Sequence, residues 1–120
     1  MLIDPSLPLL DISDQPVKEE DTVITLGVLM VRALTNPIMD PQGRPKPIPN
    51  EEKLKLWMLA GRIQNAVTPI DLTIDDVKKI KDRAGDMWSG IPLIYARLHE
   101  AFEKAASAKD VQEQPANSPD

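Results

Sequence analysis

Breaks made of proline and glycine divide the middle of the chain into apolar segments of helical length. Asn36-Pro37 follows the first segment, Pro69 follows the second, and Ser89-Gly90 separates the last two. The residue before a proline disfavours helical backbone, so these breaks set the ends of helices. With no internal repeat and no convincing pair of strands, the pattern predicts a single small all-α domain of about four helices. The expected helices are residues 25–35, 50–67, 73–87 and 90–105.

The helix expected over residues 73–87 has the clearest start. Thr73 can cap it and Asp76 follows three residues later, which is the spacing of a capping box. The first helix is apolar nearly all round, which favours burial on most sides. Gly27 within it would let a neighbouring backbone come close. Its β-branched residues leave a short strand over residues 22–31 open as the alternative.

Acidic residues are concentrated at the two ends of the chain. The net charge is −5: residues 1–21 carry −5, residues 22–106 carry +2, and residues 107–120 carry −2. Both ends contain prolines and too few apolar residues to offset their ordering entropy. We therefore predict a flexible acidic arm over residues 1–21, a helical domain over residues 22–106 and a disordered tail over residues 107–120. The leucines and isoleucines of the arm could instead lie against the core or a partner.

Composition excludes several kinds of site. The chain has no cysteine, so it has no disulfide, thiolate metal site or cysteine nucleophile. His99 is the only histidine, which is too few for a multi-histidine metal site, and His99 beside Glu100 lacks the further groups of an acid–base site. We expect no catalytic residue, no metal and no cofactor.

The sequence also bears on location. No apolar run reaches the roughly 18 residues of a membrane span. The first residues carry two prolines and no basic region, which argues against a signal peptide. The protein is therefore expected in the cytoplasm, with no membrane among its partners.

A run of bases lies in the helix expected over residues 73–87. Its members are Lys78, Lys79, Lys81 and Arg83. A helix that reads nucleic acid presents bases with little acid nearby. Here the charges from Asp75 to Asp86 sum to zero, so the run is interpreted as a solvated face. A small nucleic-acid-binding regulator using these four bases is kept as the alternative function.

Two tryptophans stand at the edges of apolar stripes. Leu54 and Met58 lie beside Trp57 and would make its helix apolar over too wide an arc for one core, so Trp57 is expected to be exposed. Trp88 ends the stripe of the following helix. Because tryptophan is enriched at interface hot spots, we predict a partner-binding surface, with packing in the core as the alternative. The predicted contact residues are Trp57, Met58, Leu54 and Trp88.

Three stretches of the chain resemble a small family of helical proteins encoded by tailed bacteriophages and prophages. They are "TLGVLMVRAL", "EEKLKLWMLAGRI" and "LTIDDVKKIKDRAGDMWSGIPLIYARLHEAF", and the resemblance covers roughly residues 23–103. The resemblance implies a non-enzymatic phage protein that binds another protein. It could be a virion or tail assembly chaperone or accessory, or an early protein that modulates a host protein. It transfers no catalytic residue and leaves the partner and the oligomeric state open.

Overall fold

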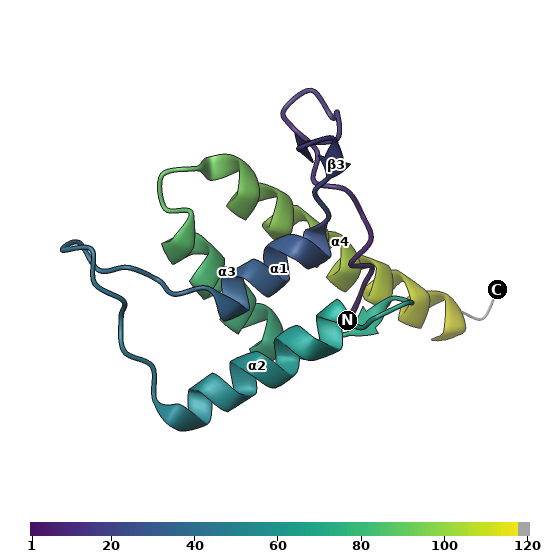
Figure 1. Ribbon diagram of the computed structural model, residues 1–120. Coiled ribbons are helices and arrows are strands. Elements are labelled where there is room, and N and C mark those ends of the chain that lie inside the picture. Colours follow the sequence, from purple (N-terminus) through teal and green to yellow (C-terminus); the bar gives the residue numbers. More distant parts are fainter. Residues whose placement is uncertain (118–120) are drawn as a thin grey trace.

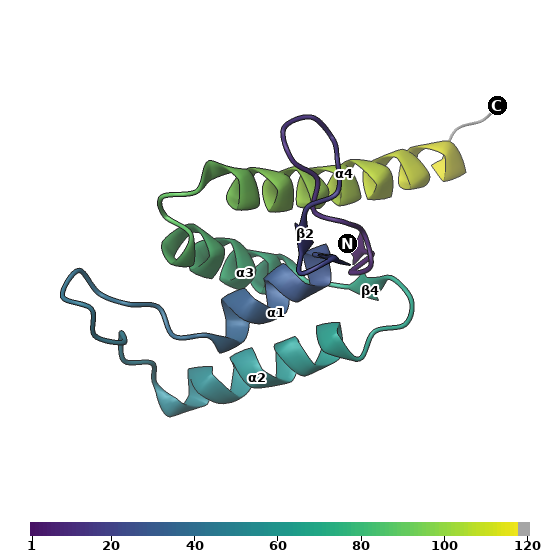
Figure 2. The same ribbon diagram turned by 45° about the horizontal axis from the view of Figure 1, so that its top comes forward.

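Four helices form the body of the protein, within the part that the computed structural model describes: the backbone of residues 1–117 and the side chains of residues 1–107. The helices are α1 (Leu26–Thr35), α2 (Asn50–Gln64), α3 (Ile74–Met87) and α4 (Pro92–Asn117). α1 lies between α2 and α3, and α4 packs against α3 on the side away from α2 (Figures 1 and 2). The four helices predicted from the sequence are present, but α2 ends at Gln64 and not at residue 67, and the backbone of α4 continues beyond residue 105. Of the alternative strand over residues 22–31, only Thr22–Val23 is a strand, and Leu26 onward is helix.

Two short antiparallel strand pairs accompany the helices in the described part of the chain. β1 (Leu2–Ile3) pairs with β4 (Ile70–Asp71), and β2 (Lys18–Glu19) pairs with β3 (Thr22–Val23). The prediction of an all-α domain without strand pairs is corrected by these elements. Each strand has two residues, which is too short for the alternation by which a strand is recognised in a sequence.

Side-chain caps fix the starts of two helices. The Thr25 hydroxyl accepts a hydrogen bond of 3.3 Å from the Val28 amide at the start of α1. At the start of α3, the Thr73 hydroxyl accepts from the Asp76 amide at 3.1 Å, and the Asp76 carboxylate accepts from the Thr73 amide at 3.0 Å. The predicted capping box is therefore confirmed. Such caps are each worth about 1 kcal/mol because they satisfy amides that the helix leaves free.

One apolar core joins all four helices. α1 supplies its centre, as expected for a helix that is apolar nearly all round. α2 and α3 each bury one stripe and leave the opposite face in solvent. The most completely buried large side chains are Leu29, Met30, Leu72, Ile80 and Leu98.

The N-terminal segment lies on the helices. Ile3 and Leu9 are buried in the same core as the helices, and the Gly27 amide donates a hydrogen bond of 2.9 Å to the Pro5 carbonyl oxygen. A β-carbon on Gly27 would lie 2.8 Å from Pro5, so glycine is required for this close approach. The predicted flexible arm over residues 1–21, and the domain boundary at residue 22, are corrected because buried apolar residues tie this segment to the core.

The connector of residues 37–49 extends away from the helices (Figure 1). Its turn is closed by a hydrogen bond of 3.0 Å from the Gly43 amide to the Asp40 carbonyl oxygen, and Gly43 has a φ of 81°. At the other end of the chain, the tail predicted to be disordered over residues 107–120 overlaps the end of α4, whose backbone is helical to Asn117, and residues 118–120 lie outside the described part.

Candidate functional site

The outer face of α2 carries a group of exposed apolar side chains. Leu54, Trp57 and Met58 have exposed fractions of 65%, 71% and 68%. They occupy positions i, i+3 and i+4, so they form one patch, and the buried Leu56 and Ile63 lie on the opposite face. The predicted exposure of Trp57 is confirmed. We call Leu54, Trp57 and Met58 the α2 surface.

Gly61 extends the α2 surface by one turn, because it lies four residues after Trp57 and three after Met58. No atom lies within 4 Å of the position that its β-carbon would occupy, so the helix backbone is open to solvent at this point. Lys55, on the adjoining part of the helix, is also exposed. The surface thus combines large apolar side chains with a place where another backbone could approach closely.

Trp88 lies apart from the α2 surface along the chain. It is the C-cap residue of α3, beside the turn into α4, and its side chain is half-buried against the core. The four residues predicted to contact a partner therefore divide into three on α2 and one at the end of α3. Trp88 contributes packing to the core, which was the alternative that the sequence left open for it.

Arg83, one of the four bases of the alternative nucleic-acid surface, points into the fold. Its Nε donates to the Ala33 carbonyl oxygen at 2.6 Å, and its terminal nitrogen donates to the Asn36 carbonyl oxygen at 2.8 Å. These carbonyls belong to the end of α1, where the helix supplies no amide donors of its own. Burial lowers the pKa of the Arg83 guanidinium from its usual value. Arg83 is thus a structural cap for α1.

Two of the other three bases are paired with acids. Lys79 Nζ lies 3.0 Å from Glu52 of α2, and Lys78 Nζ lies 3.6 Å from Asp82 on its own helix. The ion pair of Lys78 with Asp82 is exposed to solvent, so water competes for both charged groups and the pair contributes little to stability. Pairing with carboxylates reduces the positive potential that a phosphate backbone would require.

Lys81 lies against α4. Its ammonium group is 3.0 Å from His99 Nδ1 and 5.9 Å from the centre of the Tyr95 ring. The Tyr95 and His99 rings are stacked, with their centroids 6.3 Å apart. Because an ammonium group can only donate, Nδ1 of a neutral His99 accepts this hydrogen bond. The contact joins α3 to α4, and a β-carbon on Gly85 would lie 3.5 Å from the Tyr95 ring, which is an ordinary van der Waals distance.

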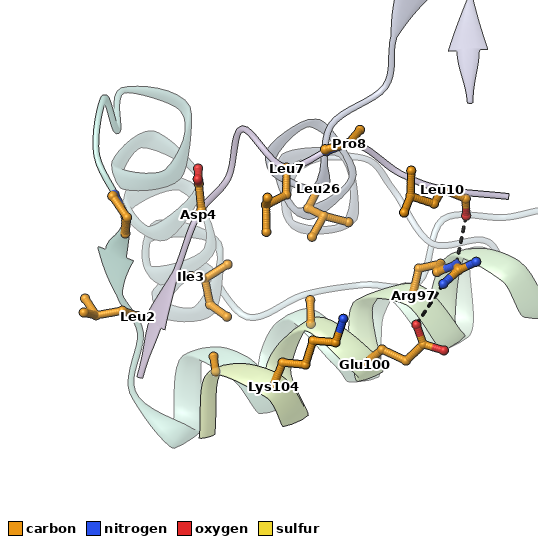
Figure 3. Close-up of a pocket in the computed structure, with 13 residues that line it drawn as sticks. Leu2, Ile3, Asp4, Leu7, Pro8, Leu10, Leu26, Arg97, Glu100 and Lys104 are labelled. Carbon is orange, nitrogen blue, oxygen red and sulfur yellow. Dashed lines mark hydrogen bonds and ion pairs between the residues drawn. The ribbon is translucent and has the colours of Figure 1, made fainter. Parts of the chain in front are cut away.

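A pocket of about 480 Å³ lies between the N-terminal segment and α4 (Figure 3). Its apolar wall is formed by the N-terminal segment, the start of α1 and one side of α4. It includes Leu2, Ile3, Leu7, Leu10, Leu26 and Ala101. The volume falls within the range of about 300–1,000 Å³ that is typical of ligand sites.

Arg97 holds the two sides of the pocket together. Its Nε donates to the Leu10 carbonyl oxygen at 2.9 Å, and a terminal nitrogen donates to the Asp11 carbonyl oxygen. The guanidinium also forms ion pairs of 3.0 Å with Asp14 and 3.1 Å with Glu100. Arg97 is therefore fully engaged in fixing the N-terminal segment to α4 (Figure 3).

Lys104 differs from Arg97 in having no counter-ion among the described residues 1–107. Its side chain extends from α4 toward the space below Leu7 and Leu26 (Figure 3). Asp4 also borders the pocket, but its carboxylate points away from Lys104 and accepts hydrogen bonds of 2.9 and 2.6 Å from the amide and hydroxyl of Ser6. These two bonds lower the pKa of Asp4.

Sequence reasoning did not find this pocket. Arg97 and Lys104 carry no spacing that distinguishes them from other bases on a helix. The usable signal was the group of leucines near the N-terminus, for which packing on the core was one of the alternatives considered. What the sequence could not indicate is that this segment crosses α4, because that contact joins residues about 87 positions apart.

Over the residues that the structure describes, no helix is long and apolar enough to cross a membrane. The same part of the chain contains no group of three or more acidic or histidine side chains arranged to hold a metal ion. The resemblance to phage proteins stays a prediction. Comparisons with models of protein families, with curated proteins and with solved structures found no match to this chain.

Proposed function

We propose that this protein acts without catalysis by binding another protein through the α2 surface. The observation that carries the proposal is the exposure of Leu54, Trp57 and Met58 side by side on one helix face. Contiguous exposed apolar side chains mark interaction sites because their burial against a partner removes them from water. Tryptophan is the side chain that most often carries the binding energy at such sites.

The resemblance to proteins of tailed phages supports a phage setting for this interaction. In that setting the partner is a virion or tail protein during assembly, or a host protein bound early in infection. Either interaction would take place in the cytoplasm of the host cell. The alternative, binding of nucleic acid by the bases of α3, is less well supported because Arg83 caps α1 and Lys79 pairs with Glu52.

Affinity capture with matched variants tests the proposal. Wild-type protein, Trp57→Ala and Ile12→Ala serve as baits, and Ile12 is chosen as the control because it is 93% exposed and lies outside the α2 surface. Each protein captured by the wild type is then purified, and its affinity for the three baits is measured by calorimetry. We expect Trp57→Ala to weaken binding about 30-fold, which corresponds to the roughly 2 kcal/mol of a hot-spot residue. Equal affinity of all three baits would contradict the proposal.

Self-association is measured in the same series. Sedimentation of the wild type and of Trp57→Ala would show whether a second copy of the chain covers the α2 surface. A dimer that dissociates in Trp57→Ala identifies the partner as the protein itself. A monomer in both cases leaves another protein as the partner.

A further inference from the structure

The pocket between the N-terminal segment and α4 has the features of a small-molecule site separate from the α2 surface. It has an apolar wall, a volume of about 480 Å³ and two sides that Arg97 holds in place. Leu2 and Leu7 remain 59% and 47% exposed where they border it. A molecule that covered them would remove apolar surface from water without any rearrangement of the core.

Charge around the pocket decides the chemistry of such a molecule. Four ionisable residues border it, and Arg97 and Glu100 neutralise each other through their ion pair of 3.1 Å. The Asp4 carboxylate keeps its charge, but it accepts two hydrogen bonds from Ser6 and points away from Lys104 (Figure 3). Lys104 remains, with its ammonium group directed toward the apolar space and no counter-ion among residues 1–107. The four formal charges sum to zero, and Lys104 is the one cation among them without a counter-ion, so the site offers an unpaired ammonium group beside an apolar wall.

We propose that this pocket binds an aliphatic monocarboxylate, such as a medium-chain fatty acid, with its carboxylate on Lys104 and its chain between the N-terminal leucines and Leu26. The carboxylate accepts a charge-assisted hydrogen bond from Lys104 Nζ, and the chain covers Leu2 and Leu7. An amine head group would meet like charge at Lys104, and a neutral head group would lose the ionic contribution. The pocket therefore distinguishes ligands of equal chain length by the charge of the head group.

Titration with three octyl compounds tests this assignment. Octanoate, octanol and octylamine are added separately to the ¹⁵N-labelled full-length protein, and affinity is read from the amide shifts of residues around the pocket. We expect octanoate to bind most tightly, with its largest shifts at Ile3, Leu7 and Lys104. Octylamine binding more tightly than octanoate would overturn the proposal, and so would octanoate shifts centred on Trp57. Absence of shifts with all three compounds would overturn it as well.

Variants separate the two parts of the site. Lys104→Gln should weaken octanoate about tenfold, the equivalent of losing one charge-assisted hydrogen bond, and should leave octanol unchanged. Leu7→Asp should weaken both compounds, whereas Ile12→Asp, which changes an exposed residue outside the pocket, should weaken neither. Circular dichroism confirms that each variant is folded. Unchanged octanoate affinity in folded Lys104→Gln would overturn the role of the lysine.

This site is independent of the α2 surface, so each can fail alone. Trp57→Ala should bind octanoate like the wild type, because Trp57 does not line the pocket. A Trp57→Ala variant that has lost its protein partner but retains octanoate affinity would support both proposals together.

Discussion

Arg83 Nε donates a hydrogen bond of 2.6 Å to the carbonyl oxygen of Ala33, so a side chain of α3 completes the end of α1. The guanidinium also reaches Asn36, the C-cap residue of α1. A base that the sequence placed on a candidate nucleic-acid surface thus connects two helices of the core. The two hydrogen bonds of Arg83 therefore help to hold the end of α1 against α3.

Replacing Arg83 by methionine should lower the free energy of unfolding by about 1.5–3 kcal/mol. Methionine keeps most of the aliphatic contact but leaves the Ala33 and Asn36 carbonyls without their charged donor. Lys78→Met is the matched control, because Lys78 is 74% exposed and pairs only with Asp82. That control should change stability by less than about 0.5 kcal/mol. Urea unfolding of both variants gives the comparison, and equal losses would show that Arg83 does not cap α1 in solution.

Two glycines in helices should respond oppositely to alanine. Gly27→Ala places a β-carbon 2.8 Å from Pro5 and should destabilise the protein by about 1–3 kcal/mol, as overpacking does. Gly61→Ala meets nothing within 4 Å and should stabilise it by about 1 kcal/mol through helix propensity. Chemical denaturation measures both changes. A stabilising Gly27→Ala would mean that the N-terminal segment does not lie on α1.

The two tryptophans should differ in what they contribute to stability. Trp57→Ala removes a side chain that is 71% exposed and should cost less than about 0.5 kcal/mol. Trp88→Ala removes half-buried packing against the core and should cost about 1–3 kcal/mol. Acrylamide quenching of the remaining tryptophan in each variant reports its exposure. Stronger quenching of Trp88 than of Trp57 would contradict the structure.

Nucleic acid should bind no more tightly than a non-specific ligand. The bases of α3 are committed to carbonyls, carboxylates and His99, so we expect a Kd no lower than the roughly 10⁻⁴ to 10⁻⁶ M of non-specific contact at physiological salt. Fluorescence anisotropy with labelled duplex and single strands measures the affinity. A nanomolar Kd would restore the nucleic-acid regulator as the leading function.

Glu19 should titrate below the usual range for a glutamate. Its carboxylate accepts hydrogen bonds of 2.9 and 3.2 Å from Arg32, and these lower the pKa of Glu19. A carboxyl whose pKa is lowered by folding stabilises the protein above its unfolded pKa, and this stabilisation is lost as the pH falls through its folded pKa. Arg32→Gln should raise the pKa of Glu19, whereas Arg44→Gln in the connector should not. Carbon NMR of the carboxyl group follows both, and a pKa that does not move in Arg32→Gln would exclude the ion pair.

Local signals in the sequence predicted the helices well, because caps and breaks act over a few residues. Thr73 with Asp76 and the close approach at Gly27 were both predicted from residue chemistry and confirmed. The exposure of Trp57 followed from counting apolar positions on one helix. Val67 shows the limit of the same reasoning, since it continues the buried stripe of α2 by spacing but lies beyond Gln64 and is 96% exposed.

Contacts between distant segments could not be predicted. The pairing of Ile3 with Ile70 and the hydrogen bonds of Arg97 to the N-terminal segment depend on how the helices pack, which no single-sequence period encodes. The pocket is formed by these contacts, so it was missed for the same reason. The acidic composition of residues 1–21 favoured a flexible arm, whereas burial of Ile3 and Leu9 determined its position.

The route of the N-terminal segment also affects the order in which the protein folds during translation. Its final position depends on β4 and on Arg97 of α4, which leave the ribosome long after it does. Helices α1 to α3 are closer to one another in sequence than the N-terminal segment is to α4, so they can associate before the contacts of that segment with α4 form. The pocket wall can therefore be completed only after α4 has been made, although the contacts of Pro5 and Leu7 with the start of α1 need only the first part of the chain.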